Sequence, residues 1–115
     1  MADLIERTEA HLVASRADER GRSAELLLHD GPLRQTIIAL TAGKSLEEHN
    51  APHAASLQVL QGLVRITGAD TEEVPTGALR IITHERHGVV AVEDSVFLLT
   101  TVTGVGPTGG PERAR

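Results

Sequence analysis

The sequence predicts an all-β domain, either a sandwich or a small barrel, with one α-helix in front of it. Two observations predict this fold class. Short apolar runs of strand length recur along residues 24–102, and turn-forming residues separate them. No stretch between these runs has a helical pattern long enough for parallel β-α-β units. The length of 115 residues suits a single compact domain.

The helix is expected from about Asp3 to Arg16. Asp3 can cap the N-terminus, and Glu6 follows three residues later, as in a capping box. Apolar residues then recur at helical spacing: Leu4, Ile5, Leu12 and Val13. The stripe that they form is narrow, so the helix should lie on a surface or against a partner. The polar stretch that follows ends the helix near Gly21.

Seven strands are expected after the helix, separated by breaks rich in Gly, Pro and charged residues. Their ranges are 24–28, 34–41, 57–61, 63–67, 78–83, 88–92 and 95–102. From residue 104 onward Gly, Pro and charged residues dominate, which predicts a disordered tail. The expected organisation is therefore a helix and linker at 1–22, a β-barrel at 23–103 and the tail at 104–115.

Composition and charge argue against several classes of protein. The formal net charge of −5 argues against a general nucleic-acid binder. No apolar run approaches the roughly 18 residues of a membrane span, and the charged N-terminus lacks the apolar region of a signal peptide. The chain has no cysteine, so it has neither disulfides nor thiolate ligands. We expect a cytoplasmic protein that binds neither nucleic acid nor membrane.

A family resemblance begins in residues 43–62, GKSLEEHNAPHAASLQVLQG. Gly43 is followed after five residues by His49, and Gly62 closes the stretch. The first motif of the cupin family reads Gly, five residues, His, one residue, His, three or four residues, Glu, six residues, Gly. Both glycines and the first histidine of this chain stand in their places in that frame.

The second cupin motif begins with a Gly, passes through a Pro-x-Gly turn and reaches a His. Gly77 opens this motif, and His87 fits its final His one residue early, although residues 83–85 do not form the Pro-x-Gly sequence. Residues 24–102 thus resemble a small single-domain, RmlC-like cupin of the bacterial uncharacterised type. The resemblance implies an all-β double-stranded β-helix, the cupin jelly-roll barrel, after the N-terminal α-helix.

Half of the metal ligands that the resemblance implies are missing. A typical cupin site places three His and one Glu around a metal, but this frame has Ala51 at its second His and Ala55 at its Glu. A catalytic transition-metal site normally needs three protein ligands, so two imidazoles alone would bind weakly. The candidate cofactor is a divalent transition metal (Fe, Mn, Ni or Zn) held by His49, His53 and His87.

Other side chains are weaker candidates for metal ligands. If position 55 points into the barrel, alternation along a strand points residues 57 and 59 inward and Gln58 away. His84 and Glu85 lie on the loop before His87 and form either an alternative ligand pair or a simple polar turn.

The remaining histidines and acidic pairs have simpler interpretations. His11 and His29 have no partner at a meaningful spacing, and we expect both at the surface. The pair Glu47–Glu48 is expected in a solvated loop, since adjacent carboxylates do not supply the opposed acids of a glycosidase. No Ser-His-Asp arrangement and no phosphate-binding Gly loop is evident in the sequence.

The predicted ligand pocket lies in the mouth of the barrel. Its residues are His49, Ala51, Ala55, Leu57, His87, Phe97 and Leu99. These residues predict a mostly apolar cavity with two imidazoles, suited to a small, partly apolar molecule that a few hydrogen bonds orient. A neutral imidazole titrates near neutrality and can act as acid or base without a metal.

Three functions remain open from the sequence. The first is a homodimeric cupin that binds or senses a small molecule and has a degenerate metal site. The second is a metal-dependent cupin enzyme, of the dioxygenase or isomerase type, that uses His49, His53 and His87. The third is an interaction module with an empty barrel. The resemblance implies a homodimer, and we expect the apolar strand AELLL and the helix, which has little of its own domain to cover, at the two-fold axis.

Overall fold

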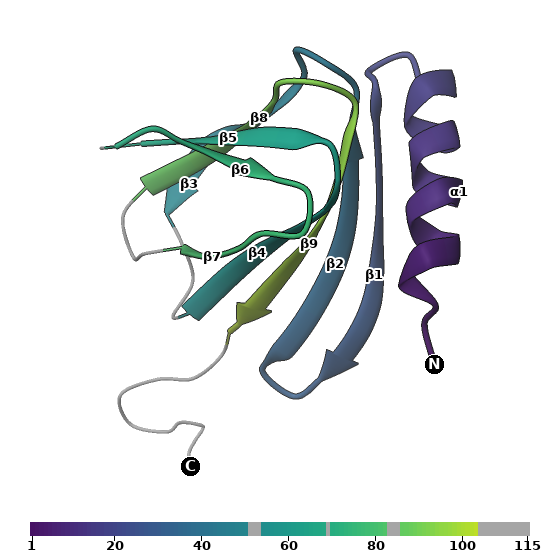
Figure 1. Ribbon diagram of the computed structural model, residues 1–115. Helices are drawn as coiled ribbons and strands as arrows, with labels where there is room; N and C mark the ends of the chain where they lie inside the picture. The colour runs from purple at the N-terminus through teal and green to yellow at the C-terminus, as the bar shows by residue number, and fades with distance from the viewer. Residues whose placement is uncertain (51–53, 69, 83–85, 104–115) are drawn as a thin grey trace.

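Two antiparallel sheets face each other in the part of the chain that the structure describes, and one helix packs outside them (Figure 1). The structure is a computed structural model that describes residues 1–50, 54–68, 70–82 and 86–103, with the backbone alone at 48–50 and 86. The predicted all-β jelly roll with one N-terminal helix is confirmed. Within the described ranges, no helix is long and apolar enough to cross a membrane.

The elements have the following bounds. The helix, α1, spans Leu4–Ala17. The five-stranded sheet has the order β1-β2-β9-β4-β7, with bounds Arg22–Asp30, Leu33–Leu40, Ser95–Val102, Ala54–Gln61 and Leu79–Ile82. The four-stranded sheet has the order β3-β8-β5-β6, with bounds Ser45–Asn50, Arg86–Ala91, Leu63–Thr67 and Glu72–Pro75.

The apolar pattern located seven of the nine strands in the described part of the chain and missed β3 and β6. The predicted ranges 63–67 and 95–102 match β5 and β9. The strands β3 and β6 were expected as a loop and a break, so the interpretation of Glu47–Glu48 as a solvated loop is wrong. Both strands are polar and lie at the edges of the four-stranded sheet, where backbone pairing with β8 and β5 holds them. Because few of their side chains reach the core, the alternation that marks a strand is weak there.

The core fills the space between the two sheets with aliphatic side chains around a single aromatic ring. Phe97 of β9 is fully buried at its centre. Along β4, Ala55, Leu57 and Val59 are buried, whereas Gln58 is half-buried and pairs with a residue of the outer face. This confirms the alternation that was expected from position 55.

Helix α1 covers the outer face of the five-stranded sheet over β1 and β2 (Figure 1). Its predicted cap is confirmed, because the Asp3 carboxylate accepts hydrogen bonds from the backbone N–H groups of Ile5 at 3.0 Å and Glu6 at 3.2 Å. Leu12 packs against Ile37 and other apolar residues of the sheet. The helix thus covers its own sheet, and the expectation that it has little of its own domain to cover is wrong.

The turn between β4 and β5 depends on Gly62, which closes the first cupin motif. Its φ is +99°, and a Cβ added here would lie 2.3 Å from Ser95 Oγ and 2.6 Å from the Asp94 carbonyl oxygen. The Ser95 hydroxyl is fully buried, accepts from the Leu63 N–H at 3.0 Å and lies 2.6 Å from the Glu93 carbonyl oxygen. The glycine is therefore required by its backbone conformation and also by the close approach of the β8–β9 turn.

Candidate functional site

An apolar cavity of about 60 Å³ lies between the two sheets, near the ends of β4, β7, β8 and β9. Five of the residues that we expected in the ligand pocket line it: Ala55, Leu57, His87, Phe97 and Leu99. The other lining residues are Leu46, Ile82, Gly88, Val89 and Thr101. Among all these residues, the imidazole of His87 is the one titratable group. Two other expected pocket residues are not placed by side chain: Ala51 lies outside the described residues, and only the backbone of His49 is described.

His87 stands near the start of β8, and its backbone pairs in register with that of His49 in β3. Its ring Nδ1 lies 3.1 Å from the carbonyl oxygen of Thr67 in β5. Because a carbonyl oxygen only accepts, Nδ1 carries a hydrogen and donates this bond. The strand β5 therefore sets the orientation of the imidazole at the wall of the cavity.

A second, wider pocket of about 320 Å³ shares Ile82 and His87 with the apolar cavity. Its polar wall is formed by Asp70, Glu72 and Arg80. Arg80 of β7 makes an ion pair with Glu72 of β6, and this pair joins edge strands of the two sheets. The result is an apolar inner cavity and a charged outer pocket, with His87 at their boundary.

The described residues do not make up the metal site of a typical cupin. Ala55, at the Glu position of the frame, is a methyl group only 7% exposed that faces the apolar cavity. Within the described ranges, no group of three or more His, Asp or Glu side chains could hold a metal ion. His87 does have the bond from Nδ1 to a carbonyl that often orients a metal-binding His. His53, His84 and Glu85 lie outside the described residues, so their part in a metal site stays a prediction.

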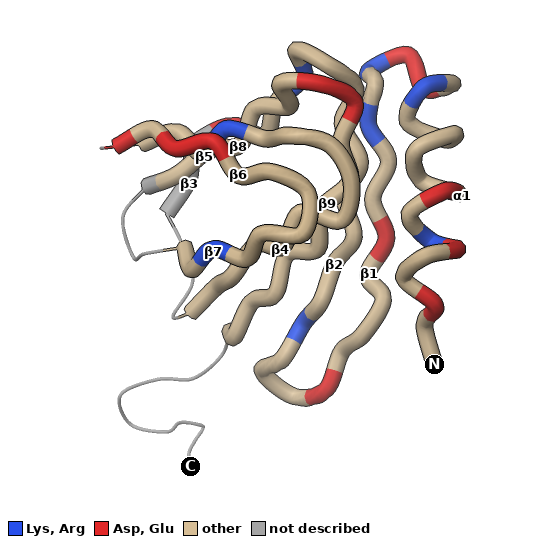
Figure 2. The backbone as a smooth tube through the Cα atoms, viewed as in Figure 1, with Lys and Arg blue, Asp and Glu red and all other residues tan. Residues whose placement is uncertain are grey.

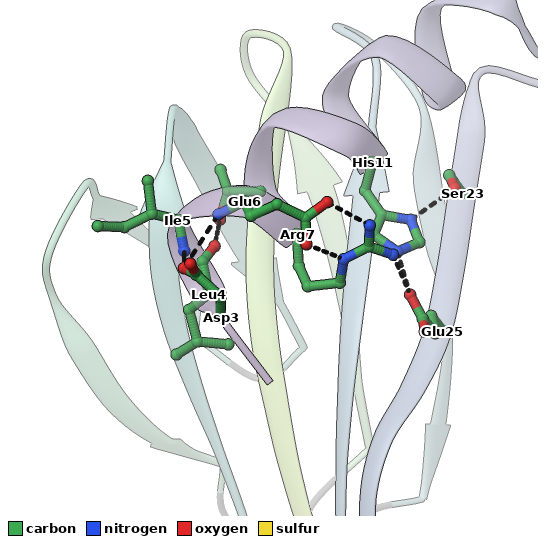
Figure 3. A network of polar contacts seen from close by, with 9 residues as sticks. Asp3, Leu4, Ile5, Glu6, Arg7, His11, Ser23 and Glu25 are labelled. Carbon is green, nitrogen blue, oxygen red and sulfur yellow. Dashed lines mark hydrogen bonds and ion pairs between the residues drawn. The ribbon is translucent and has the colours of Figure 1, made fainter. Parts of the chain in front are cut away.

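Sequence reasoning missed a polar cluster between α1 and β1 (Figure 3). His11 is only 8% exposed, so its expected place at the surface is wrong. Its Nδ1 lies 2.7 Å from Ser23 Oγ, and its Nε2 lies 2.8 Å from Glu25 Oε1. Arg7 also donates to Glu25 at 3.1 Å, and the bonds from His11 and then Arg7 hold the pKa of Glu25 below its usual value. The helical spacing of the sequence could have indicated this burial, because it places His11 on the same face of the helix as Thr8, Leu12 and Ser15, which are also buried.

The C-terminal end of α1 is fastened by Asp94, in the turn between β8 and β9. Its carboxylate accepts from the Ala42 N–H at 2.9 Å and from Arg16 Nε at 2.8 Å. These bonds, with that from Ala42 the stronger influence, hold the pKa of Asp94 below its usual value. The bond from Arg16 joins α1 to the barrel, and the bond from Ala42 joins two turns of the barrel. We interpret both bonds as structural.

Comparison with known proteins supports the fold without giving an activity. No protein-family model matches the sequence, and no curated protein matches it significantly. Many solved structures do match. One of them, a conserved protein of unknown function from Streptococcus pyogenes, is 26% identical, with a TM-score of 0.68 over 75% of this chain and 77% of that one.

Other matches are described as cupins. A cupin superfamily protein from Desulfitobacterium hafniense is 17% identical, with a TM-score of 0.67 over 71% of this chain and 77% of that one. An RmlC-like cupin from Desulfovibrio desulfuricans is 24% identical, with a TM-score of 0.67 over 74% of this chain and 85% of that one. Together with the two facing sheets and the glycine frame, these matches confirm the resemblance at the level of architecture: the chain has the RmlC-like cupin fold.

Proposed function

We propose that the barrel binds a small molecule with a short apolar group and a polar head. The observation that carries this proposal is the junction at His87 between an apolar inner cavity and a charged outer pocket. The inner volume of about 60 Å³ is roughly twice the share of one water molecule in the liquid and well below the ~150 Å³ of a cavity that holds benzene. It suits a short aliphatic group better than a ring.

The outer pocket supports the same proposal. Its volume of about 320 Å³ falls within the range of roughly 300–1,000 Å³ that is usual for ligand pockets. Asp70, Glu72 and Arg80 supply charges of both signs there, and His87 adds a hydrogen-bonding ring at the boundary. Because the inner cavity alone would hold little, the outer pocket is what favours ligand binding over an interaction module with an empty barrel.

We propose that the site holds no tightly bound metal ion. The buried methyl group of Ala55 replaces a carboxylate of the cupin frame, and three protein ligands are the usual minimum for a catalytic metal. The alternative, a metal-dependent enzyme that uses His49, His53 and His87, depends on residues that the structure does not describe in full, and it stays a prediction. Metal analysis of protein purified without chelators separates the two. Tightly held, stoichiometric Fe, Mn, Ni or Zn would overturn the metal-poor site, and metal that survives replacement of His49 and His87 by Ala would overturn the alternative.

A thermal-unfolding screen with short aliphatic carboxylic acids, amines and alcohols tests the binding proposal. A ligand that binds only the folded protein, at 100 times its dissociation constant, adds about 2.7 kcal/mol to the free energy of unfolding. Ala55→Leu fills the inner cavity, whereas Ala54→Leu adds the same group to the exposed neighbouring position. Ala55→Val is a milder second variant, because overpacking costs about 1–3 kcal/mol.

We expect at least one compound to stabilise the native chain and Ala54→Leu but not the Ala55 variants. A screen in which nothing stabilises the native chain contradicts the proposal. Equal stabilisation of all variants also contradicts it, because the compound would then bind outside the barrel.

A further inference from the structure

We propose that the groove beneath the first turn of α1 binds a linear primary amine, with the alkyl chain on the sheet and the ammonium group at the carboxylates of Glu6 and Glu25. This site is separate from the barrel, so it does not depend on the function proposed above. The groove has a volume of about 580 Å³, within the range of roughly 300–1,000 Å³ that is usual for ligand pockets. We call it the helix groove, and its apolar lining residues include Leu4, Leu27, Leu28 and Leu98.

The helix groove forms because α1 packs closely on the sheet only beyond its first turn. The buried residues of the helix are Thr8, His11, Leu12 and Ser15. Leu4 lies one turn before Thr8 on the same face and is only half-buried. The 14 residues of α1 rise about 21 Å, whereas the nine residues of β1 rise about 30 Å. The strands therefore extend past the start of the helix and leave the outer face uncovered there (Figure 1).

A β-bulge widens the apolar floor of the groove. The pairing of β1 with β2 shifts its register between Leu26 and Leu28. Successive residues of a regular strand point to opposite faces, but the residue that a bulge adds breaks this alternation. The consecutive residues Leu27 and Leu28 accordingly both line the groove. Leu98 of β9 extends the floor, because it pairs with Ile37, on which the helix packs, and so shares the outer face.

The rim of the groove is acidic (Figure 3). Arg7 of α1 pairs with the neighbouring Glu6 and donates to Glu25 of β1 at 3.1 Å. With Asp3, three carboxylates and one guanidinium line the groove, so the formal charge of these side chains is −2. The bond from Arg7 holds the pKa of Glu6 below its usual value, and the bonds from His11 and then Arg7 do the same for Glu25. Both carboxylates are therefore ionised at neutral pH.

These charges favour a cation over an anion as the head of the ligand. The side chains of Glu6 and Glu25 are 56% and 43% exposed, so an incoming ammonium group can reach both. Arg7 is already held between these two carboxylates, so an anionic head would meet more negative than positive charge. Figure 2 shows acidic residues on both α1 and β1, whereas β4 and β9 have none. The net charge of −5 adds a general attraction for cations.

The length of the alkyl chain should set the affinity. Each methylene group that leaves water is worth about a fourfold gain in affinity. Octylamine should therefore bind roughly 10- to 20-fold more tightly than hexylamine, because two more methylene groups lie on the leucine floor. Since the groove is open to solvent and a small ligand makes few contacts, we expect a dissociation constant on the order of 1 mM for octylamine.

Titration of the native chain with octylammonium chloride, followed by two-dimensional NMR of the backbone amides, tests the proposal. We expect saturable shifts at Leu27 and Leu28. Octanoate, which has a chain of the same length and the opposite charge, should bind at least about fivefold more weakly. Ala55→Leu fills the inner cavity of the barrel and should leave the affinity for octylamine unchanged.

Two pairs of variants locate the ligand. Leu28→Ser should weaken octylamine binding at least about threefold, because part of the apolar floor is lost. Leu26→Ser is its matched control, since Leu26 and Leu28 are 43% and 45% exposed on the same strand but Leu26 does not line the groove. Glu6→Gln should weaken binding about two- to fivefold, as is usual for an exposed charge. Glu9→Gln removes the same charge from an exposed position of α1 outside the groove and should have no effect.

Three results would overturn the proposal. The first is a native chain that shows no saturable binding of octylamine up to about 20 mM, well above the expected dissociation constant. The second is octanoate that binds as tightly as octylamine. The third is binding that Ala55→Leu abolishes and Leu28→Ser leaves unchanged, which would place the ligand in the barrel. Circular dichroism verifies the fold of each variant, and if Leu28→Ser unfolds, the comparison of Glu6→Gln with Glu9→Gln decides.

Discussion

Replacing Gly62 by Ala tests how closely the β4–β5 turn meets the β8–β9 turn. At its φ of +99° a side chain adds strain of about 1–3 kcal/mol. The new Cβ would also lie 2.3 Å from Ser95 Oγ and 2.6 Å from the Asp94 carbonyl oxygen, so Ser95 has to move. The buried Ser95 hydroxyl would lose its bonds to the Leu63 backbone, each with a net value of about 0.5–1.5 kcal/mol. The total loss is about 2–6 kcal/mol, out of the ~5–15 kcal/mol that is usual for a domain.

The first glycine of the same motif provides a matched control. Gly43 has a φ of +86°, but a Cβ there meets nothing within 4 Å, so Gly43→Ala should cost the strain alone, about 1–3 kcal/mol. Urea unfolding followed by far-UV circular dichroism suits the comparison, because the chain has neither Trp nor Tyr for fluorescence. Equal losses in the two variants would refute the reasoning, since the contact with Ser95 would then have no energetic consequence.

Three further predictions concern the polar contacts of α1, and urea unfolding measures each. His11→Ala should lower the free energy of unfolding by about 2–4 kcal/mol, because two partly buried hydrogen bonds are lost and the removal of a ring only 8% exposed leaves a cavity. A loss below about 0.5 kcal/mol, as at a surface site, would contradict this prediction. The pKa of folded Glu25 lies below its unfolded value of 4.5, so its contribution is present above that pH and disappears as the pH falls through the folded pKa. The free energy of unfolding should therefore fall more steeply with pH below 4.5 in the native chain than in Glu25→Gln. Equal pH dependence in the two proteins would contradict this prediction. Asp94→Ala should lower the free energy of unfolding more than Arg16→Ala, because Asp94 accepts a hydrogen bond from Ala42 as well as from Arg16. The exposed ion pair between Arg16 and Asp94 contributes at most about 1 kcal/mol. A larger loss in Arg16→Ala would contradict this prediction.

The sequence predicted those strands that have an apolar inner face. In β4 and β9, buried and less buried residues alternate or form a continuous apolar run, and both strands were found. The strands β3 and β6 escaped because their order comes from pairing with β8 and β5, which no local pattern shows. Their sequences, SLEEHN and EEVP, read locally as loops. Polar edge strands such as β3 and β6 are thus predictable only after their neighbours are placed, whereas the more apolar edge strands β1 and β7 were found from the sequence.

The residues of the candidate site also fall into two groups, those that the sequence indicated and those that it missed. The cupin frame pointed to Ala55, Leu57 and His87 as neighbours, because motif spacing carries three-dimensional information that local pattern does not. The charged pocket formed by Glu72 and Arg80 was missed, since it requires β6 and β7 from different sheets to meet at their edges. Partners far apart in the sequence, including those of His11, become visible only with the fold.

The glycines of the cupin frame and its ligand positions answer different physical demands. Gly43, Gly62 and Gly77 have φ values between +85° and +99°, which L side chains rarely adopt, so these turns need glycine whatever the barrel binds. Position 55 has no such demand, because a methyl group packs well in an apolar cavity where an ionised carboxylate without a partner would be costly. A chain can therefore keep every turn of the barrel without keeping the ligands. For this reason the glycines identify the fold, whereas the function has to be argued from the cavity that Ala55 leaves apolar and the charges that stand outside it.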